Sequence, residues 1–403
     1  MEWKEVKIGD LGQIITGKTP KTAIRENWGG KIPFLSPSDD MSNKTSPVTA
    51  RTLTELGVAE VAKCLIPANS ICVSCIGSDL GKVVKTDREL VTNQQINTIV
   101  PHSNVDSDFV YYLMCIVGKE LNYISKTSTA VPIINKSTFS DWNIVIPEKV
   151  DDQRRIASIL SSLDRKIELN NKINADLEEM AQAIFKNWFV DFEPFKDGKF
   201  VDSELGMIPE GWEVGTLGEF CKCLLGGTPS RSKEEYWNGD VNWINSGEIN
   251  KFRILEASEK ITELGLAKSA TKLLPKKTTV LAITGATLGQ VSLLEIDTCA
   301  NQSVIGVLEN AEVPYEYIYP FIKDRIEMLI QHQTGGAQQH INKDNVESLI
   351  FLLPAINVLE DYISLVSPMY KRIESQCFEN LYLSLLRDTL LPRLMSGELE
   401  VPE

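Results

Sequence analysis

Apolar residues recur in alternating steps of four and three between Asp151 and Trp188, and this pattern predicts one long helix. The positions in phase are Ile156, Leu160, Leu163, Ile167, Asn170, Asn174, Leu177, Ala181, Ile184 and Trp188. A repeat sustained over this length is typical of a coiled coil rather than of a short amphipathic helix. Asp152 follows Asp151 where acidic residues favour a helix N-terminus, and Pro194 prevents continuation. A helix of about 38 residues would be about 57 Å long, so it needs another helix to cover its apolar side.

The C-terminal region repeats this spacing and is predicted to supply the covering helix. Its positions in phase are Val366, Met369, Ile373, Gln376, Asn380, Leu383, Arg387, Leu390 and Leu394. Asn380 falls where the repeat would place Asn174, and buried asparagines restrict the register and the choice of partner helix. Pro368 predicts a break or a late start in the first turns. The alternative is two amphipathic helices that belong to separate domains.

The whole chain contains two copies of one unit, offset by 207 to 209 residues in the matches below. The matched pairs are Gly17–Pro20 with Gly226–Pro229, Trp28–Gly30 with Trp237–Gly239, Thr54–Gly57 with Thr262–Gly265, Leu65–Pro67 with Leu273–Pro275, Gly77–Gly81 with Gly285–Gly289, Asn93–Gln94 with Asn301–Gln302, and Ile134–Lys136 with Ile341–Lys343. Such colinear matches with so little drift indicate an internal duplication. Each copy runs from a globular head into a long helix.

The heads are predicted to mix short strands with one helix each. Short β-branched runs such as Lys82–Lys85 and Asn143–Ile146 alternate with turn residues, and the helices are expected at Phe109–Tyr123 and Tyr315–Ile330. The fold class is therefore α+β, with two mixed α/β domains in a pseudo-two-fold tandem repeat, separated by two long antiparallel coiled-coil helices. The predicted segments are residues 1–150, the helix 151–193, the linker and second head 194–355, and the helix 356–403. The stretch Lys196–Trp212 is read as the linker.

The composition indicates the cellular compartment in which we expect the protein. The 403 residues show no N-terminal signal pattern and no apolar run long enough to cross a membrane, so we expect a soluble, cytoplasmic protein. The eight cysteines show no disulfide spacing. Cys72 and Cys75 have a zinc-like spacing, but their run resembles a buried strand. The second copy has Val280 and Ile283 there, which argues against a metal.

Charge does not by itself indicate a nucleic-acid partner, because the net charge is −14. Basic residues nevertheless cluster locally, at Lys18, Lys21, Arg25 and Lys31 and again between residues 251 and 277. A tandem of diverged heads on a rigid spacer suits a bipartite target with two different halves. The alternatives are a scaffold that holds two partner proteins apart, or an enzyme with two active sites.

The full length of the chain resembles the DNA specificity subunit of type I restriction-modification systems. The resemblance rests on the linker Asp202–Trp212, the helix end Phe185–Phe192, the tail Leu390–Leu399 and the Gly-Thr-Pro and Tyr-Trp-Asn-Gly segments of the second head. The first head departs from the family pattern, because Thr127–Ala130 stands where the second has Gly335–Gln339.

This resemblance implies two target-recognition domains that each read one half of an asymmetric, interrupted DNA site. It also implies that the two helices set the gap and dock two modification subunits, which use S-adenosylmethionine to methylate adenine. Restriction subunits, where present, use ATP and Mg²⁺ to translocate and cleave DNA. No cofactor is expected in the specificity subunit itself, which is not catalytic.

A phosphate-loop pattern is the main enzymatic alternative. Gly12–Thr19 satisfies G-x-x-x-x-G-K-T, but that site needs a preceding hydrophobic strand and a following helix. Pro20 disfavours a helix at this point, and the second copy lacks the lysine. His102, His332 and His340 lack metal-ligand spacing, and no adenine-methylation tetrad or nuclease dipeptide occurs. We therefore predict a non-catalytic chain.

DNA contacts are expected in two classes of residue. Lys136 and Lys343 are identical in both copies, so they cannot distinguish two half-sites and are predicted as scaffold first and phosphate contacts second. Base readers are predicted where the copies differ, among polar and basic loop residues. The candidates are Lys18, Lys21, Lys44, Arg51 and Lys126 in the first head, and Arg231, Lys251, Arg253, Gln338 and Gln339 in the second. For each one, a solvated side chain without a DNA contact is the alternative.

Overall fold

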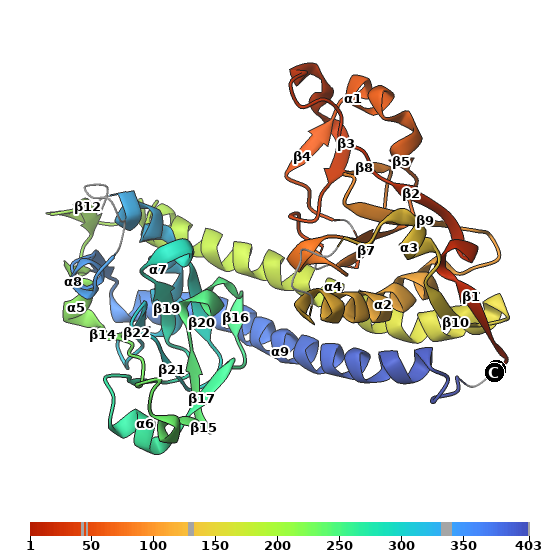
Figure 1. Cartoon of the computed structure of the whole chain (residues 1–403). Coiled ribbons are helices and arrows are strands. Elements are labelled where there is room, and N and C mark those ends of the chain that lie inside the picture. Colours follow the sequence, from red (N-terminus) through yellow and green to blue (C-terminus); the bar gives the residue numbers. More distant parts are fainter. Residues whose placement is uncertain (42–43, 46, 128–132, 332–340, 402–403) are drawn as a thin grey trace. The chain divides into compact units, whose positions relative to one another are not determined.

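The computed structural model describes residues 1–41, 44–45, 47–127, 133–331 and 341–401, and its chain divides into two compact units (Figure 1). Unit 1 comprises Met1–Glu168 with Tyr382–Glu403, and unit 2 comprises Leu169–Leu381. Both boundaries fall inside long helices, so each unit contains one head and a segment of each helix. The four-segment division from the sequence treats the helices as separate parts, and it stays a prediction.

Unit 1 is built on two four-stranded sheets. The first has the order β2-β9-β6-β7, formed by Gly12–Thr16, Ile96–Pro101, Ile71–Ser74 and Val83–Lys85. The second has the order β4-β3-β8-β5, formed by Arg51–Leu53, Trp28–Leu35, Leu90–Thr92 and Leu65–Ile66. A further pair joins β1 (Trp3–Lys7) to β10 (Asn143–Pro147). The pairing is antiparallel throughout, except that β3 and β8 run parallel.

Unit 2 repeats this topology strand for strand. The order β14-β22-β19-β20 is formed by Lys222–Leu225, Val304–Leu308, Thr279–Ala282 and Val291–Leu294, and the order β17-β15-β21-β18 by Glu259–Ile261, Trp237–Ile244, Thr298–Ala300 and Leu273–Leu274. The strands β13 (Glu213–Thr216) and β23 (Ile350–Leu353) pair as β1 and β10 do. The first of these sheets has one additional strand, β16 (Arg253–Ile254), which lies parallel to β20 at the sheet edge. The sequence duplication is therefore a duplication of fold.

Each head packs one predicted helix on its first sheet. Helix α2 (Ser107–Thr127) lies against β6 and β7, and α7 (Tyr315–Gln331) lies against β19 and β20. Both predicted helices are confirmed, as are the strands expected near Lys82–Lys85 and Asn143–Ile146. The short helices are α1 (Glu55–Glu60), α3 (Lys136–Ser140), α5 (Leu217–Phe220), α6 (Glu263–Ala267) and α8 (Lys343–Glu347). The 3-10 turns are η1 (Ile8–Asp10), η2 (Arg25–Asn27), η3 (Ala62–Cys64), η4 (Gly77–Asp79), η5 (Glu193–Phe195), η6 (Glu234–Tyr236), η7 (Ser246–Asn250) and η8 (Gly285–Thr287).

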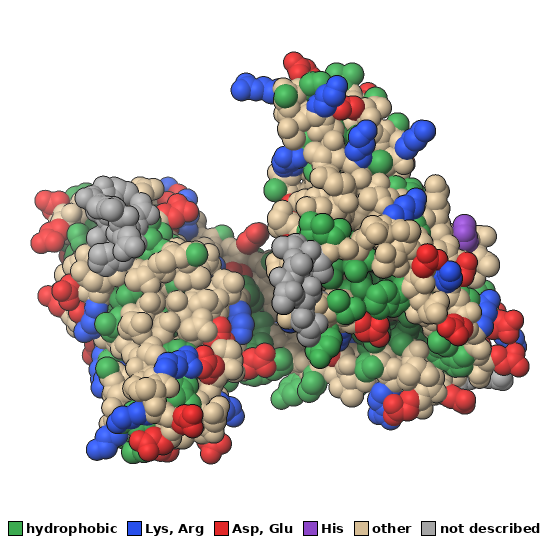
Figure 2. Space-filling view, viewed as in Figure 1, with side chains coloured by type: hydrophobic (Ala, Val, Ile, Leu, Met, Phe, Trp, Pro, Cys, Tyr) green, Lys and Arg blue, Asp and Glu red, His purple; other side chains and the backbone are tan. Residues whose placement is uncertain are grey.

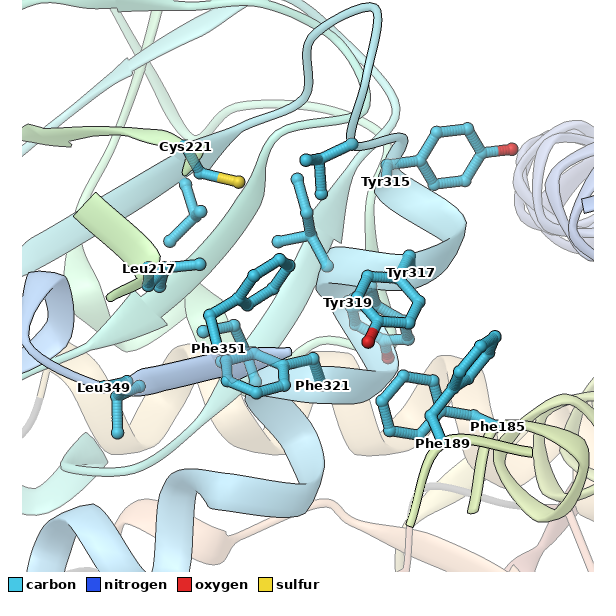
Figure 3. Close-up of a cluster of buried hydrophobic side chains, with 14 of the residues drawn as sticks. Phe185, Phe189, Leu217, Cys221, Tyr315, Tyr317, Tyr319, Phe321, Leu349 and Phe351 are labelled. Carbon is cyan, nitrogen blue, oxygen red and sulfur yellow. The ribbon is translucent and has the colours of Figure 1, made fainter. Parts of the chain in front are cut away.

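The central helix α4 (Val150–Phe189) confirms the helix predicted from the apolar spacing, and none of its in-phase residues is exposed. Within unit 1, Ile156 and Leu160 are buried in one core with Leu391 and Leu394. Within unit 2, the helix buries two aromatic rings that the spacing did not include, Phe185 and Phe189. Figure 3 shows these rings beside Tyr317 of α7. Helix α4 therefore buries residues against the head of unit 2 as well as against α9.

The C-terminal helix α9 (Ile356–Met395) is continuous, so the break or late start predicted from Pro368 is wrong. Pro368 itself is exposed, whereas Val366 and Tyr370 on either side of it are buried in the core of unit 2. Burial of these flanking side chains holds the backbone helical although one N–H is missing, because packing overrides local propensity. The predicted linker also has structure of its own, since β11 (Phe200–Ser203) and β12 (Gly206–Pro209) form a hairpin.

Candidate nucleic-acid interface

The two Gly-x-Thr-Pro loops are fixed to the Asn-Gln turns in the same way in both units. The hydroxyl of Thr19 donates to Oε1 of Gln94 at 2.7 Å, and that of Thr228 donates to Oε1 of Gln302 at 2.6 Å. At Gly17, a Cβ would lie 2.1 Å from the carbonyl oxygen of Thr92, so a side chain does not fit. These shared residues hold the loop that follows them in place, which is a scaffold role.

The loops that follow carry candidate contacts in exposed positions. Lys18 and Lys21 are exposed in unit 1, and the backbone N–H of Lys21 donates to Oε1 of Glu60 at 3.2 Å. In unit 2 the matching loop carries Arg231, whose side chain is 56% exposed. Figure 2 shows Lys and Arg side chains gathered over the part of unit 1 that contains α1, β3 and β4.

In each unit an arginine stacks on the tryptophan that begins the longest strand. The Cζ atom of Arg51 lies 3.8 Å from the ring centroid of Trp28, and that of Arg231 lies 3.6 Å from that of Trp237. Stacking on an indole restricts the orientation of a guanidinium. The N–H groups at the edge of the guanidinium stay available for hydrogen bonds. Arg51 is therefore preorganised for a planar ligand or anion, whereas the guanidinium of Arg231 already bonds both carboxylate oxygens of Glu259.

Two of the candidate base readers have largely enclosed side chains, which argues against the base contacts predicted for them. The Lys44 side chain is 9% exposed, and its Nζ lies 2.8 Å from Asp108 and 2.7 Å from the hydroxyl of Ser161 on α4. The Arg253 side chain is 1% exposed, and its Nη2 lies 2.7 Å from Oε2 of Glu178 on α4. In this structure neither side chain extends from the surface, as a contact to a base in a groove requires.

These two cations hold the heads to α4 from matching places in the two units. Arg253 pairs with Leu293 along the sheet edge, and Thr45, next to Lys44, pairs with Lys85, which is 208 positions before Leu293. Burial acts to raise the pKa of Glu178, but Arg253 and Lys323 outweigh it and lower that pKa. Asp108 shows the same balance, since Lys44 and Lys85 lower its pKa against the effect of burial.

The remaining candidates differ in their surroundings. Lys126 and Lys136 are exposed, whereas Lys251 and Lys343 form ion pairs with Glu248 and Glu347. Gln338 and Gln339 lie outside the described residues. For all of these positions a DNA contact stays a prediction.

A basic cavity in unit 1 was not anticipated from the sequence. It has a volume of about 440 Å³ and is lined by Lys82, Lys119 and Lys126 with Asn122 and Tyr123. Lys119 and Lys126 are seven residues apart on α2, and a residue spacing of seven places side chains on one helix face. The spacing could have indicated from the sequence that Lys119 lies beside Lys126. Lys82 belongs to a distant segment, which only the fold brings near them.

Enzymatic alternatives find no geometric support in the described parts of the chain. Gly12–Thr16 of the phosphate-loop pattern is strand β2, and no helix begins directly after Thr19, so backbone N–H groups do not form a phosphate cradle there. Cys72 lies in the buried strand β6, as predicted, and burial raises its pKa to about 12. Among the residues described, no group of His, Cys, Asp and Glu could hold a metal ion. In the same residues, no helix combines the length and apolarity needed to span a membrane.

Comparison with known proteins agrees with the duplicated architecture. The type I restriction modification DNA specificity domain matches residues 1–179 and again residues 209–376. The MjaIX specificity subunit of Methanocaldococcus jannaschii is 30% identical over 411 residues, which cover 100% of this chain and 94% of that protein. The HindI specificity subunit of Haemophilus influenzae is 25% identical over 466 residues, which cover 99% of this chain and 100% of that protein.

A solved structure shows the same fold. The crystal structure of the type I restriction-modification system S subunit from M. genitalium aligns with a TM-score of 0.59 at 16% identity, covering 100% of this chain and 97% of that one. Two matched specificity domains, two repeated heads and full-length relatives lead to one conclusion. The chain belongs to the family of type I restriction-modification DNA specificity subunits.

Proposed function

We propose that this chain recognises a bipartite, asymmetric DNA site, with unit 1 reading one half and unit 2 the other. The observation that carries the proposal is the duplicated head with different side chains at matched strand positions. Identical folds place equivalent surfaces toward similar ligands, and differing polar side chains let each surface prefer a different base sequence. The net charge of −14 favours weak binding by the chain alone and strong binding within a larger complex.

The long helices are the proposed spacer and docking surface. Within unit 2, Asn170 contacts Asn380 and Asn174 contacts Cys377, so residue numbers rise along one helix as they fall along the other. Within unit 1, Asp164 of α4 forms an ion pair with Arg387 of α9, so the two helices also contact each other there. This order supports an antiparallel coiled-coil pair, in which the length of the helices would set the gap between the half-sites.

The proposed partners are double-stranded DNA and two modification subunits, with restriction subunits as a further possibility. S-adenosylmethionine, ATP and Mg²⁺ would serve those subunits, and this chain would bind no cofactor and catalyse no step. A cytoplasmic location fits these partners, because DNA and its modification enzymes meet there.

Methylation-site sequencing of the host with and without this gene tests the proposal. We expect the parent genome to carry methylated adenine at one interrupted, asymmetric motif, and the deletion strain to lose that motif alone. A plasmid copy of the gene should restore it, which controls for effects on neighbouring genes. An unchanged methylation pattern after deletion would instead support a scaffold without a DNA role.

A further inference from the structure

In both units an arginine lies over the same pair of aromatic positions, but the two arginines come from different places in the sequence. Arg51 lies 5.2 Å from the ring centroid of Phe34, and Arg231 lies 5.2 Å from that of Trp243, in addition to the stacks on Trp28 and Trp237. Both arginines thus occupy the same aromatic corner of the second sheet. The sequence, however, supplies Arg51 from β4, after the tryptophan, and Arg231 from the loop before it.

Strand register shows that the matching positions carry opposite charges. Arg51 is paired with Phe34 across β3 and β4, and Glu259 is paired with Trp243 across β15 and β17. Arg51 and Glu259 therefore hold equivalent places in the two sheets. In unit 2 the loop arginine meets this carboxylate, and Nη2 of Arg231 lies 2.9 Å from Oε1 of Glu259 while Nη1 bonds the other oxygen.

The consequence is that the two stacked guanidinium groups differ in what they can still bind. The paired N–H groups of Arg231 are occupied by Glu259, and the two charges cancel. Arg51 is exposed, and within the described residues no carboxylate bonds its guanidinium. An immobilised guanidinium with unoccupied N–H groups suits two acceptors in one plane, such as O6 and N7 of guanine or two phosphate oxygens.

We propose that Arg51 reads a guanine in the half-site of unit 1, and that Glu259 withdraws the equivalent stacked arginine from DNA in unit 2. The inference rests on the proposed function and adds a residue that determines specificity. A base contact is favoured over a phosphate contact because both units have the tryptophan, whereas the matching strand position carries a positive charge in unit 1 (Arg51) and a negative charge in unit 2 (Glu259). Phosphate contacts position a protein equally on any sequence, whereas base contacts are the ones that must differ between half-sites.

The test uses the complete complex with its modification subunits and a panel of duplexes in which each recognised base pair is changed in turn. Arg51→Ala is expected to reduce discrimination at one G·C pair about 5- to 150-fold and to leave the other positions unchanged. Arg51→Lys keeps the charge but lacks the planar pair of N–H groups, so it should not restore discrimination. Arg88→Ala is the matched control, because Arg88 is an exposed arginine of the same unit whose guanidinium is already bonded to Asp87.

Glu259→Gln tests the second part of the proposal. It should release Arg231 and give tighter DNA binding with a steeper dependence on salt, and unchanged binding would overturn the withdrawal by Glu259. Equal weakening of all sequences by Arg51→Ala would show a phosphate contact and overturn base reading. An Arg51→Ala complex identical to the parent would overturn any contact. A parent complex that methylates without sequence preference would refute the proposed function itself, which separates the two failures.

Discussion

Glu178 shows at the level of single residues why a basic side chain in this chain need not contact DNA. It lies on α4 and accepts hydrogen bonds from Arg253 at 2.7 Å and from Lys323 at 2.9 Å. Arg253 also bonds the hydroxyl of Tyr319 at 3.1 Å. A buried ion pair is costly to break from one side, because the remaining charge stays out of water without a partner.

Replacing Glu178 by Ala should therefore destabilise the chain strongly. We expect a loss of up to about 3–5 kcal/mol in the free energy of unfolding, since Arg253 would stay buried with only the longer ion pair to Glu295, at 3.9 Å from its Nε, to compensate its charge. Lys186→Ala is the control, because it breaks an ion pair with Asp191 in which the side chains are 62% and 41% exposed, and it should cost under about 1 kcal/mol. Urea unfolding monitored by circular dichroism measures both, and equal losses would contradict the buried-pair account.

The same carboxylate should make stability depend on pH. The folded chain holds the pKa of Glu178 below the ordinary value of 4.5, because its two cations outweigh burial. The unfolded chain thus binds this proton more readily, so the stabilisation is complete above pH 4.5 and is lost as the pH falls through the lowered pKa. Glu178→Gln should flatten the fall in unfolding free energy between neutral and acid pH. Parallel curves for parent and variant would exclude this contribution.

At the level of elements, an amide cluster sits where α4 and α9 meet within unit 2. Asn170 donates to Glu379 and Asn380, both at 2.8 Å, and accepts from Gln376 at 3.1 Å. Asn174 is less well satisfied, because within the described residues its Oδ1 has no partner and its Nδ2 meets only the Cys377 sulfur at 3.6 Å. Buried amides of this kind restrict the register of paired helices at some expense of stability.

The two asparagines should respond differently to leucine. Asn170→Leu should lower the unfolding free energy by about 1–3 kcal/mol, because it leaves the buried amide of Gln376 without a partner. Asn174→Leu removes an unsatisfied oxygen and should be near neutral or stabilising. Thermal and urea unfolding of the two variants provide the comparison, and a larger loss for Asn174→Leu would show that the cluster has been misassigned.

At the level of the whole molecule, both long helices contribute residues to both units. Each helix has 40 residues, which corresponds to about 60 Å at about 1.5 Å per residue. Under the proposed function, this length rather than either head determines the spacing of the DNA site.

Paired seven-residue insertions, one after Asn174 and one after Gln376, should therefore lengthen the gap and leave both half-sites unchanged. Seven residues preserve the heptad phase and add about 10.5 Å, or about three base pairs. The second half-site also rotates around the duplex, so binding should weaken. Single-turn insertions of four residues should add about one or two base pairs with a smaller loss.

Methylation-site sequencing reads the outcome of these insertions. A seven-residue insertion in the turn between β11 and β12, outside both helices, is the control and should keep the original gap. Full activity with an unchanged gap in the helix variants would show that the helices are not the spacer. Altered half-sites would show that they take part in readout.

The sequence by itself determined the duplication, the element types and the long helices. These follow from local patterns, because helix periodicity and matched turn residues are properties of neighbouring positions. The break or late start predicted from Pro368 was wrong, because burial of Val366 and Tyr370 holds a helix that local propensity disfavours. The segment from Lys196 to Trp212 was predicted to be a linker, and part of it forms the β11–β12 hairpin.

Only the tertiary structure decided which charges are available. Lys44, Arg51, Arg231 and Arg253 look equivalent in the sequence, yet Lys44 and Arg253 are enclosed against α4 and Arg231 is bonded to a glutamate. Arg51 differs because its strand position places it on Trp28, and among the described residues no carboxylate forms an ion pair with its guanidinium. The physical reason is that a charge is compensated by residues distant along the chain, and only folding brings them within a few ångströms.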